Sequence, residues 1–394
     1  MKESLFNYRF EYENQKYIFN TNNNGLIQIN NDIFTEEERE YLRVNRFWVD
    51  DNEDEIALLE REINHNIQKR QKELELTIAL TNYCNFSCVY CYQNKNEKLM
   101  TTEVANMIIE KIDRILNDNK FEGINIHYFG GEPLLNIPVL IYLDENIKKI
   151  TDKIGIVYKA FLTTNGSMLS KELLQKVKFS SIQLTFDGLE KTHDRLRVSD
   201  HFPFKEEIEL IENIMNFSQA KVLLRTNICK ENKDEIIALH KYIFEKFGNE
   251  RIEINPNRTI KYHQDDSFEM LSVQEYAEVA YQIKLLWSEQ KGKFELPVPR
   301  STLCKFPYGN AYAISPEGYC TFCSGSMDQE KKIFFDVDIE NKKMFFVRKE
   351  CKKCNILPLC LGGCIIQYNL RAGACTYEKY ELKNILISYI KHIS

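Results

Sequence analysis

The stretch Cys84-Asn-Phe-Ser-Cys88-Val-Tyr-Cys91 decides the interpretation of this chain. Its three thiols are separated by three and then by two residues, and they follow the largely apolar run 74–80. A four-iron cluster normally takes four cysteines, so three would leave one iron open to a ligand that is not protein. A zinc site or buried thiols are the alternatives, but no fourth Cys or His for zinc lies between Asn82 and Val104.

Length and composition indicate a soluble protein of two or three domains. The chain has 394 residues, of which 43% are hydrophobic and 28% charged, and its net charge is −6. The charge gives no electrostatic footprint for nucleic acid. No apolar run approaches the ~20 residues of a membrane span, and the N-terminus lacks the apolar core of a signal peptide. We therefore expect a cytoplasmic protein with neither nucleic acid nor membrane as a partner.

The cysteines are unevenly distributed. Eleven of the twelve fall into two groups, one around Cys88 and one between Cys304 and Cys375. Without a signal peptide, this clustering favours metal binding in a reducing cytoplasm over a disulfide framework. Cys229 stands alone, and we interpret it as a small buried hydrophobic residue.

Strand and helix patterns alternate from residue 73 to about 290. The expected strands are Glu73–Leu80, Ile124–Phe129, Val157–Thr163, Ser181–Phe186, Val222–Asn227 and Arg251–Asn255. The expected helices are Thr102–Asn117, Ile137–Lys149, Lys171–Val177, Phe204–Phe217, Lys233–Phe247 and Val273–Gln290. Six βα units predict an α/β fold with a parallel sheet and outer helices. Because a closed barrel needs eight such units, six predict a partial, TIM-like (β/α)6 barrel.

The first 72 residues predict a small α+β module. Two short strands are expected at 6–12 and 17–20, Thr35 caps a helix, and a longer helix covers 53–69. The order of elements resembles leader-peptide recognition modules, and a cap packed against the barrel is the alternative. The domain limits that we expect are 1–72, 73–300 with a linker at 291–300, and 301–394.

Three polar motifs follow the first cysteine group, each at the carboxyl end of an expected strand, where barrel active sites are built. They are Gly130-Gly131-Glu132-Pro133, Thr164-Asn165-Gly166 and Thr185-Phe186-Asp187-Gly188. With the cysteines, this ordered set resembles the radical SAM superfamily over residues 73–255. The resemblance implies a 4Fe–4S cluster on Cys84, Cys88 and Cys91 whose open iron binds S-adenosylmethionine (SAM) through its amine and carboxylate.

The same resemblance assigns cofactor-binding roles. Gly130 and Gly131 would let the backbone approach the cofactor, and Glu132 would accept hydrogen bonds from the methionine amine. Ribose and carboxylate contacts are implied for Thr185, Asp187 and Arg197, with further contacts for Asn165 and Asn227 and an adenine contact for Tyr90. The alternative is purely structural, because Gly-Gly, Asn-Gly and Asp-Gly dipeptides often only form turns. The sequence suggests no catalytic acid or base.

The second cysteine group resembles the SPASM extension of that superfamily. Its members are Cys304, Cys320, Cys323, Cys351, Cys354, Cys360, Cys364 and Cys375. A zinc ribbon is the alternative. The resemblance implies two auxiliary 4Fe–4S clusters, one on Cys351, Cys354, Cys360 and Cys375, the other on Cys304, Cys323 and Cys364. Cys320 is additional and either completes the second of these clusters or leaves there an open iron for a substrate thiolate. The C-terminal part is therefore expected to be a cysteine-rich iron–sulfur domain, giving three clusters in all.

The resemblance also implies a function. SPASM-bearing relatives mostly modify peptides, so we expect a maturase that abstracts hydrogen from a ribosomally made precursor peptide and is reduced by a flavodoxin or ferredoxin. A thioether cross-link is the leading product, and a carbon–carbon cross-link or an epimerised residue is the main rival. An anaerobic sulfatase maturase is less favoured, because those relatives carry an aspartate where this chain has Ser324. A non-catalytic electron-transfer or peptide-binding protein is disfavoured by the intact motifs.

Overall fold

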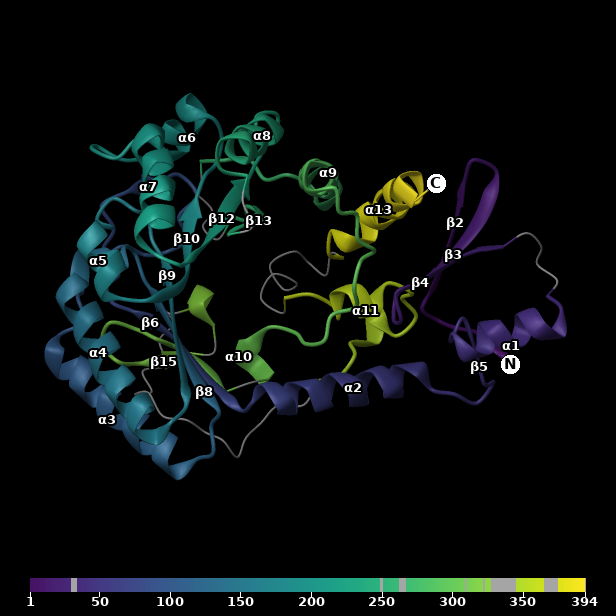
Figure 1. Cartoon of the computed structure of the whole chain (residues 1–394), viewed down its shortest axis with the longest axis horizontal. Coiled ribbons are helices and arrows are strands. Elements are labelled where there is room, and N and C mark those ends of the chain that lie inside the picture. The colour runs from purple at the N-terminus through teal and green to yellow at the C-terminus, as the bar shows by residue number, and fades with distance from the viewer. Residues whose placement is uncertain are drawn as a thin grey trace. The chain divides into compact units, whose positions relative to one another are not determined.

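The computed structural model of the chain describes residues 1–29, 34–248, 251–261, 267–308, 310–321, 323–326, 345–364 and 375–393. These residues form two compact units (Figure 1). The barrel unit comprises the described residues within 69–271 and 305–343. The terminal unit comprises those within 1–68, 272–304 and 344–394.

An open eight-stranded sheet forms the barrel unit. Its order is β13-β12-β10-β9-β8-β6-β14-β15, and every neighbouring pair is parallel except β14 with β15. The strands are β6 (Glu73–Ala79), β8 (Gly123–Phe129), β9 (Val157–Thr163), β10 (Phe179–Thr185), β12 (Lys221–Ile228), β13 (Ile252–Arg258), β14 (Ala311–Ile314) and β15 (Cys320–Thr321). The six strands expected from the sequence lie side by side in chain order, which confirms the partial-barrel prediction.

Helices cover the outer face of this sheet (Figure 1). They are α3 (Thr102–Asp118), α4 (Ile137–Ile154), α5 (Lys171–Lys176), α6 (Glu190–Leu196), α7 (Phe204–Phe217) and α8 (Ile236–Phe247), with short turns at η1 (Pro133–Asn136), η2 (Ser324–Ser326) and α10 (Lys305–Tyr308). Successive strand side chains point to opposite faces, and the outer set is apolar and almost fully buried. It includes Leu74, Leu76, Ile78, Ile124, Ile126, Tyr128, Ile182, Leu184, Val222 and Leu224. The inner set is largely polar.

The sequence did not reveal β14, which pairs in parallel with β6 and adds a strand beyond the six βα units. Its four residues, Ala-Tyr-Ala-Ile, are too few to show a period, and the helix α10 that precedes it also has only four residues. All four residues are buried. Neighbours distant in sequence therefore determine this strand, and its local pattern does not.

The terminal unit contains both ends of the chain, and one of its apolar clusters has residues from each end. It contains β1 (Lys2–Glu3), β2 (Asn7–Tyr12), β3 (Gln15–Asn20), β4 (Gly25–Ile29), β5 (Trp48–Val49), α1 (Glu36–Val44), α2 (Glu55–Arg70), α9 (Val273–Lys291), η3 (Lys349–Cys351), α11 (Leu357–Cys360) and α13 (Glu378–Ile393). Thr35 caps α1 as predicted: its hydroxyl accepts from Glu38 N at 3.2 Å. Phe10 and Phe19 pack with Leu382 and Leu386. The domain limits given above remain a prediction.

Within the described residues, none of the helices is both long enough and apolar enough to cross a lipid bilayer.

Candidate functional site

The first cysteine group lies in the loop after β6. Cys88 belongs to the two-residue strand β7 (Ser87–Cys88), which pairs antiparallel with β11 (Arg197–Val198), so Cys88 lies opposite Arg197. Val89 N also donates to Leu196 O at 3.0 Å. Burial raises the pKa of Cys88 to about 11, and nearby Cys91 and Cys84 contribute to the same shift. Among the described residues, no group of Cys, His, Asp or Glu has the arrangement of a single-ion site.

The Gly-Gly motif supports this loop from the next strand. Gly131 N donates to Thr81 O at 2.8 Å, and Glu132 N donates to Tyr83 O at 2.9 Å. A Cβ at Gly130 would lie 2.2 Å from Thr81 O, and one at Gly131 would lie 2.2 Å from Tyr83 O. Gly130 also has φ +129°, a conformation open to glycine alone. The structure therefore gives these glycines a second role, which is to let the cysteine loop lie directly on the motif.

Glu132 is fully buried, and its carboxylate joins its own turn to the segment that follows β9. Its carboxylate accepts from Thr164 Oγ1 at 2.7 Å, from Asn165 N at 2.7 Å and from Leu134 N at 3.0 Å. Burial raises the pKa of Glu132 to about 7, although these hydrogen bonds oppose the shift. Two carboxylate oxygens can accept about four hydrogen bonds, so the three described here leave room for one more. A hydrogen bond from the methionine amine would fill it, and this role remains a proposal.

Asn165 reaches the cysteine loop from β9. Its Nδ2 donates to Asn85 Oδ1 at 2.8 Å and lies 3.8 Å from Cys84 Sγ. Ser167 Oγ donates to Asn165 Oδ1 at 2.7 Å and accepts from Asn85 Nδ2 at 2.9 Å. The structure thus brings this sequence-predicted residue beside the first of the three thiols.

Asp187 forms hydrogen bonds with two other residues that were predicted for the site, Tyr90 and Asn227. It is fully buried, accepts from Asn227 N at 2.6 Å, and accepts a hydrogen bond from the Tyr90 hydroxyl. Asn232 Nδ2 donates to the backbone oxygen of Asp187 at 2.8 Å. Burial raises the pKa of Asp187, and the Arg197 charge opposes the rise. Thr185 is buried at the end of β10, two residues earlier.

The ring of Tyr90 packs edge-on against Phe268, with ring centroids 6.5 Å apart. Cys229 is fully buried in the same apolar cluster, which confirms its interpretation as a core residue. The proposed adenine contact of Tyr90 is therefore next to a buried apolar cluster.

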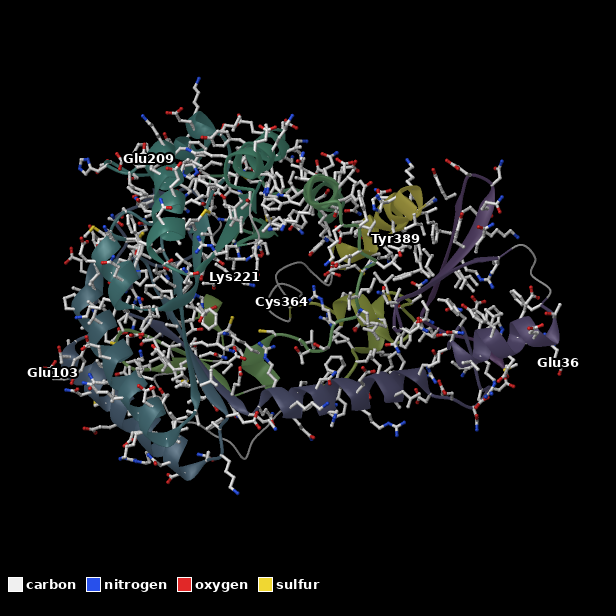
Figure 2. All side chains as sticks on the ribbon, in the orientation of Figure 1. Glu36, Glu103, Glu209, Lys221, Cys364 and Tyr389 are labelled. Atoms are coloured by element: carbon white, nitrogen blue, oxygen red, sulfur yellow. The ribbon has the colours of Figure 1, made fainter. Side chains whose placement is uncertain are left out.

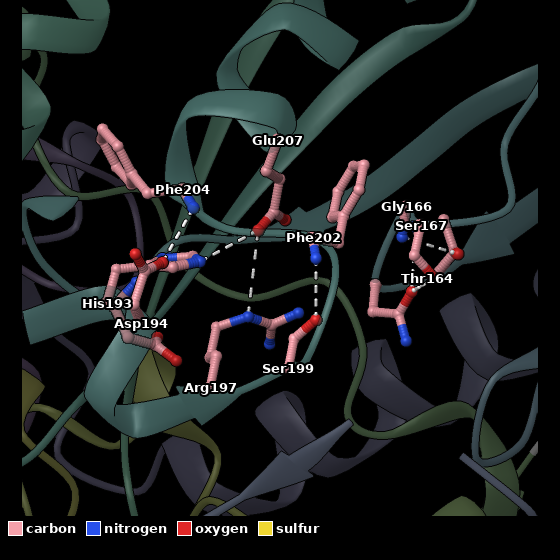
Figure 3. Close-up of polar contacts among 12 residues, drawn as sticks. Thr164, Gly166, Ser167, His193, Asp194, Arg197, Ser199, Phe202, Phe204 and Glu207 are labelled. Carbon is pink, nitrogen blue, oxygen red and sulfur yellow. Dashed lines mark hydrogen bonds and ion pairs between the residues drawn. The ribbon is translucent and has the colours of Figure 1, made fainter. Parts of the chain in front are cut away.

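Arg197 is a buried cation whose polar partners lie at long hydrogen-bond and ion-pair distances (Figure 3). Its NH1 lies 3.5 Å from the Tyr90 hydroxyl, its Nε lies 3.9 Å from Glu207 Oε2, and its guanidinium lies over the Phe86 ring at 5.4 Å. The Nε atom is buried without a hydrogen-bond partner. A buried guanidinium with an unsatisfied donor fits a carboxylate ligand, such as the one carried by the methionine part of SAM.

Glu207 was not identified from the sequence. It comes from α7, is fully buried, and lies 3.1 Å from His193 Nε2 through Oε2 (Figure 3). The His193 ring in turn accepts from Asp187 N at 3.4 Å. One sequence feature could have identified Glu207: it lies on the apolar face of the helix, with Phe204, Ile208 and Ile211. A charged residue is rare at such a position unless it is paired.

Thr164 and Asn232 were also missed as individual contacts, because turn-forming motifs do not reveal which side chain bonds to which group.

The second cysteine group is divided between the two units. In the terminal unit, burial raises the pKa of Cys351, and nearby Cys354 and Cys375 contribute to the rise. Cys354 also contributes to the raised pKa of Cys360. Burial raises the pKa of Cys360 to about 11, and Gly362 N donates to its sulfur at 3.4 Å. Cys364 is exposed in the same unit (Figure 2). In the barrel unit, Gly325 N donates to Cys323 Sγ at 3.3 Å, and Cys320 begins β15. Cys304 is exposed.

Comparison with known proteins identifies a family. Residues 78–243 match the model of the Radical SAM superfamily. The chain is 24% identical, over 83% of its length and 76% of the relative's, to the radical SAM cyclopropyl synthase TigE of Paramaledivibacter caminithermalis. Two further curated relatives are matched over half of their own length or less. The chain covers 50% of the GTP 3′,8-cyclase of Clostridium perfringens at 31% identity, and 39% of an uncharacterized protein of Methanocaldococcus jannaschii at 34% identity.

Two solved structures share the fold. One is anSMEcpe with bound AdoMet and the Cp18Cys peptide, with a TM-score of 0.60, 18% identity, and coverage of 82% of this chain and 98% of that chain. The other is Streptococcus suis SuiB bound to its precursor peptide SuiA, with a TM-score of 0.54, 15% identity, and coverage of 93% and 96%.

Proposed function

We propose that this chain modifies a ribosomally made precursor peptide. The premise is that residues 78–243 are a radical SAM domain, so that the chain is a radical SAM enzyme with a 4Fe–4S cluster and SAM as cofactors. The observation that supports the site is the pairing of Cys88 with Arg197, because it brings the proposed cluster ligand opposite the buried guanidinium that we propose as the carboxylate receptor. Peptide as the substrate class is supported by likeness to SuiB, solved with its precursor peptide, and to anSMEcpe, solved with a peptide.

The residues of the chain have separable roles in this proposal. Cys84, Cys88 and Cys91 hold the cluster, and the loop that carries them rests on Gly130 and Gly131. Arg197 receives the methionine carboxylate, Glu132 its amine, and Asp187 with Asn227 the ribose. When bound, cluster and SAM supply a 5′-deoxyadenosyl radical that removes hydrogen from a substrate carbon.

A thioether cross-link is the product that we favour. The attacked carbon and the cysteine sulfur each lose one hydrogen, and one carbon–sulfur bond forms. One hydrogen would leave in 5′-deoxyadenosine and the other as a proton, and a cluster held by the cysteines would accept the surplus electron. One SAM is thus converted to methionine and 5′-deoxyadenosine without net consumption of electrons.

Carbon–carbon bond formation is the second candidate, and the similarity to a cyclopropyl synthase over most of the chain favours it specifically. Both products lose two hydrogen atoms, so mass alone does not separate them.

The remaining assignments of the proposal concern electron transfer. Cys351, Cys354, Cys360 and Cys375 hold one auxiliary cluster, and Cys304, Cys323 and Cys364 hold the other. Cys320 either completes this second cluster or is not a ligand, in which case one of its irons stays open. A flavodoxin or ferredoxin supplies the first electron. Nearby Cys354 and Cys375 contribute to the raised pKa of Cys351, and this proximity supports the first of these ligand sets.

The test is anaerobic turnover, with SAM and dithionite, of a candidate precursor peptide that is sought as a short reading frame beside the gene. We expect a product lighter by two hydrogen atoms. If iodoacetamide labels one cysteine fewer in the product than in the precursor, the bond is a thioether; equal labelling indicates a carbon–carbon bond. Unchanged mass in water with deuterium gained from heavy water would instead show epimerisation, and an unmodified peptide would contradict the proposal.

A further inference from the structure

The inner face of the barrel sheet contains a cavity of about 260 Å³ that is lined by polar side chains and by the apolar Phe161, Leu162 and Leu223. Strands β6, β8, β9, β10 and β12 and helix α10 line it. Thr163 and Gln183 line the cavity nearest the carboxyl ends of their strands. They come one and two residues before Thr164 and Thr185 of the candidate site. Because the strands are parallel, the cavity lies directly beneath that site along the strand direction.

Three charged side chains, two cations and one carboxylate, form a cluster at the cavity. Lys305 Nζ lies 3.0 Å from Glu75 Oε2, and Arg70 Nε lies 3.0 Å from Glu75 Oε1. Two cations thus face one carboxylate, and of these cations Lys305 lines the cavity. The pair is half-buried, with side-chain exposures of 27% for Lys305 and 11% for Glu75, so solvent screens its charge incompletely.

The other polar groups add donors without adding charge. His127 Nε2 lies 2.8 Å from Thr163 Oγ1, and burial, with help from the Lys305 charge, lowers the pKa of His127 to about 4, so the ring is neutral. Gln183 Oε1 accepts from Asn255 Nδ2 at 3.5 Å, and within the described residues its amide NH₂ group has no acceptor. Nor does Lys305 have a second carboxylate there. An ionised carboxylate, which only accepts hydrogen bonds, complements this arrangement.

We propose that this cavity receives the carboxylate of an aspartate or glutamate side chain of the peptide substrate, with Lys305 as its ion-pair partner. The inference rests on the proposed peptide substrate and names the residue type that enters the barrel. Its carboxylate would be held deep in the cavity, so the carbons next to it would lie nearer the cofactor site. A charge-assisted hydrogen bond of about 1.5 kcal/mol corresponds to roughly tenfold in affinity.

Lys221 provides a matched control. It starts β12, and its Nζ lies 2.5 Å from Glu253 Oε1, so it also forms a Lys–Glu pair on this sheet (Figure 2). That pair is exposed, at 57% and 51%, and neither residue lines the cavity.

The experiment is anaerobic equilibrium dialysis of three radiolabelled probes, the N-acetyl N-methylamides of aspartate, asparagine and alanine, against the reconstituted full chain without SAM. We expect the aspartate probe to bind about tenfold more tightly than the asparagine probe. Lys305→Gln should abolish this preference, whereas Lys305→Arg and Lys221→Gln should keep it. Iron content and circular dichroism verify that each variant is folded; should Lys305→Gln fail this check, the comparison of probes on the wild type still decides.

Equal binding of the aspartate and asparagine probes, no retention of the aspartate probe, or a preference that survives Lys305→Gln would overturn the inference. The dialysis needs no radical chemistry. Failure of the proposed function would be recognised separately, as an absence of 5′-deoxyadenosine when SAM and dithionite are added.

Discussion

The Thr164 hydroxyl donates a hydrogen bond to Glu132 Oε1 at 2.7 Å, and it also accepts from Gly166 N at 2.9 Å. This contact joins the end of β9 to the Gly-Gly motif, which in turn carries the cysteine loop through Thr81 and Tyr83. A buried carboxylate that loses a donor is penalised by the cost of desolvation.

We therefore expect Thr164→Val to lower the free energy of unfolding by about 1–3 kcal/mol. Thr164→Ser, which keeps the hydroxyl, should remain close to wild type. Anaerobic urea titrations of the three proteins measure the difference. Equal midpoints for the Val and Ser variants would show that this hydrogen bond contributes little.

Gly130 is expected to be essential for the cluster and not only for the turn. Gly130→Ala places a Cβ 2.2 Å from Thr81 O, which must displace the loop that carries the cysteines. Gly155 also has a positive φ, +83°, but open space surrounds its Cβ position, so Gly155→Ala should cost only about 1 kcal/mol. Iron analysis should show that Gly130→Ala loses the first cluster, whereas Gly155→Ala keeps it. Full iron content in Gly130→Ala would refute the role of close packing.

Glu207 is expected to position Arg197. Glu207→Gln removes the carboxylate beside both His193 and Arg197, so the guanidinium should lose its orientation, and we expect SAM affinity to fall about tenfold, or about 1.4 kcal/mol. Glu209→Gln changes an exposed glutamate on the same helix and should leave affinity unchanged (Figure 2). Equilibrium dialysis of labelled SAM below the unfolding temperature measures both. A purely structural Glu207 would lower the melting temperature and leave the dissociation constant of SAM unaltered.

His240 should make stability depend on pH. Burial lowers the pKa of His240 to about 3, whereas an unfolded histidine titrates near 6.5, so below pH 6.5 the unfolded chain binds a proton that the folded chain excludes. Stability from this residue is complete above pH 6.5 and declines by about 1.4 kcal/mol per pH unit as the pH falls toward 3. Between pH 7.5 and 5.5, His240→Phe should consequently lose less stability than wild type in anaerobic urea titrations. Parallel losses in the two proteins would indicate that the native ring is protonated.

Much of this fold could be predicted because its elements are locally encoded. The helices α3 and α7 and the strands β8 and β9 have strong apolar periods, and they occur within a few residues of the expected positions. The polar motifs meet because parallel strands deliver their carboxyl ends to one edge of the sheet, so their proximity follows from topology alone.

Other features depend on contacts that a local pattern does not record. Glu207 acquires its role only when α7 packs beside β11, and its sequence neighbours mark it merely as a charge on an apolar face. The packing of the Gly-Gly motif on Thr81 and Tyr83 likewise joins segments about fifty residues apart, and motif resemblance indicated only a cofactor contact at these glycines. The strand β14 depends on pairing with β6 in the same manner.

The central claim is that the first three cysteines hold a cluster with one iron open to SAM, and reductive cleavage of SAM tests it most directly. The anaerobically reconstituted, dithionite-reduced protein should convert SAM to 5′-deoxyadenosine and methionine in equal amounts. Cys88→Ala should form neither, while it retains the iron of the auxiliary clusters. Undiminished 5′-deoxyadenosine formation by Cys88→Ala, or zinc in place of iron at these three thiols in the wild-type protein, would contradict the account.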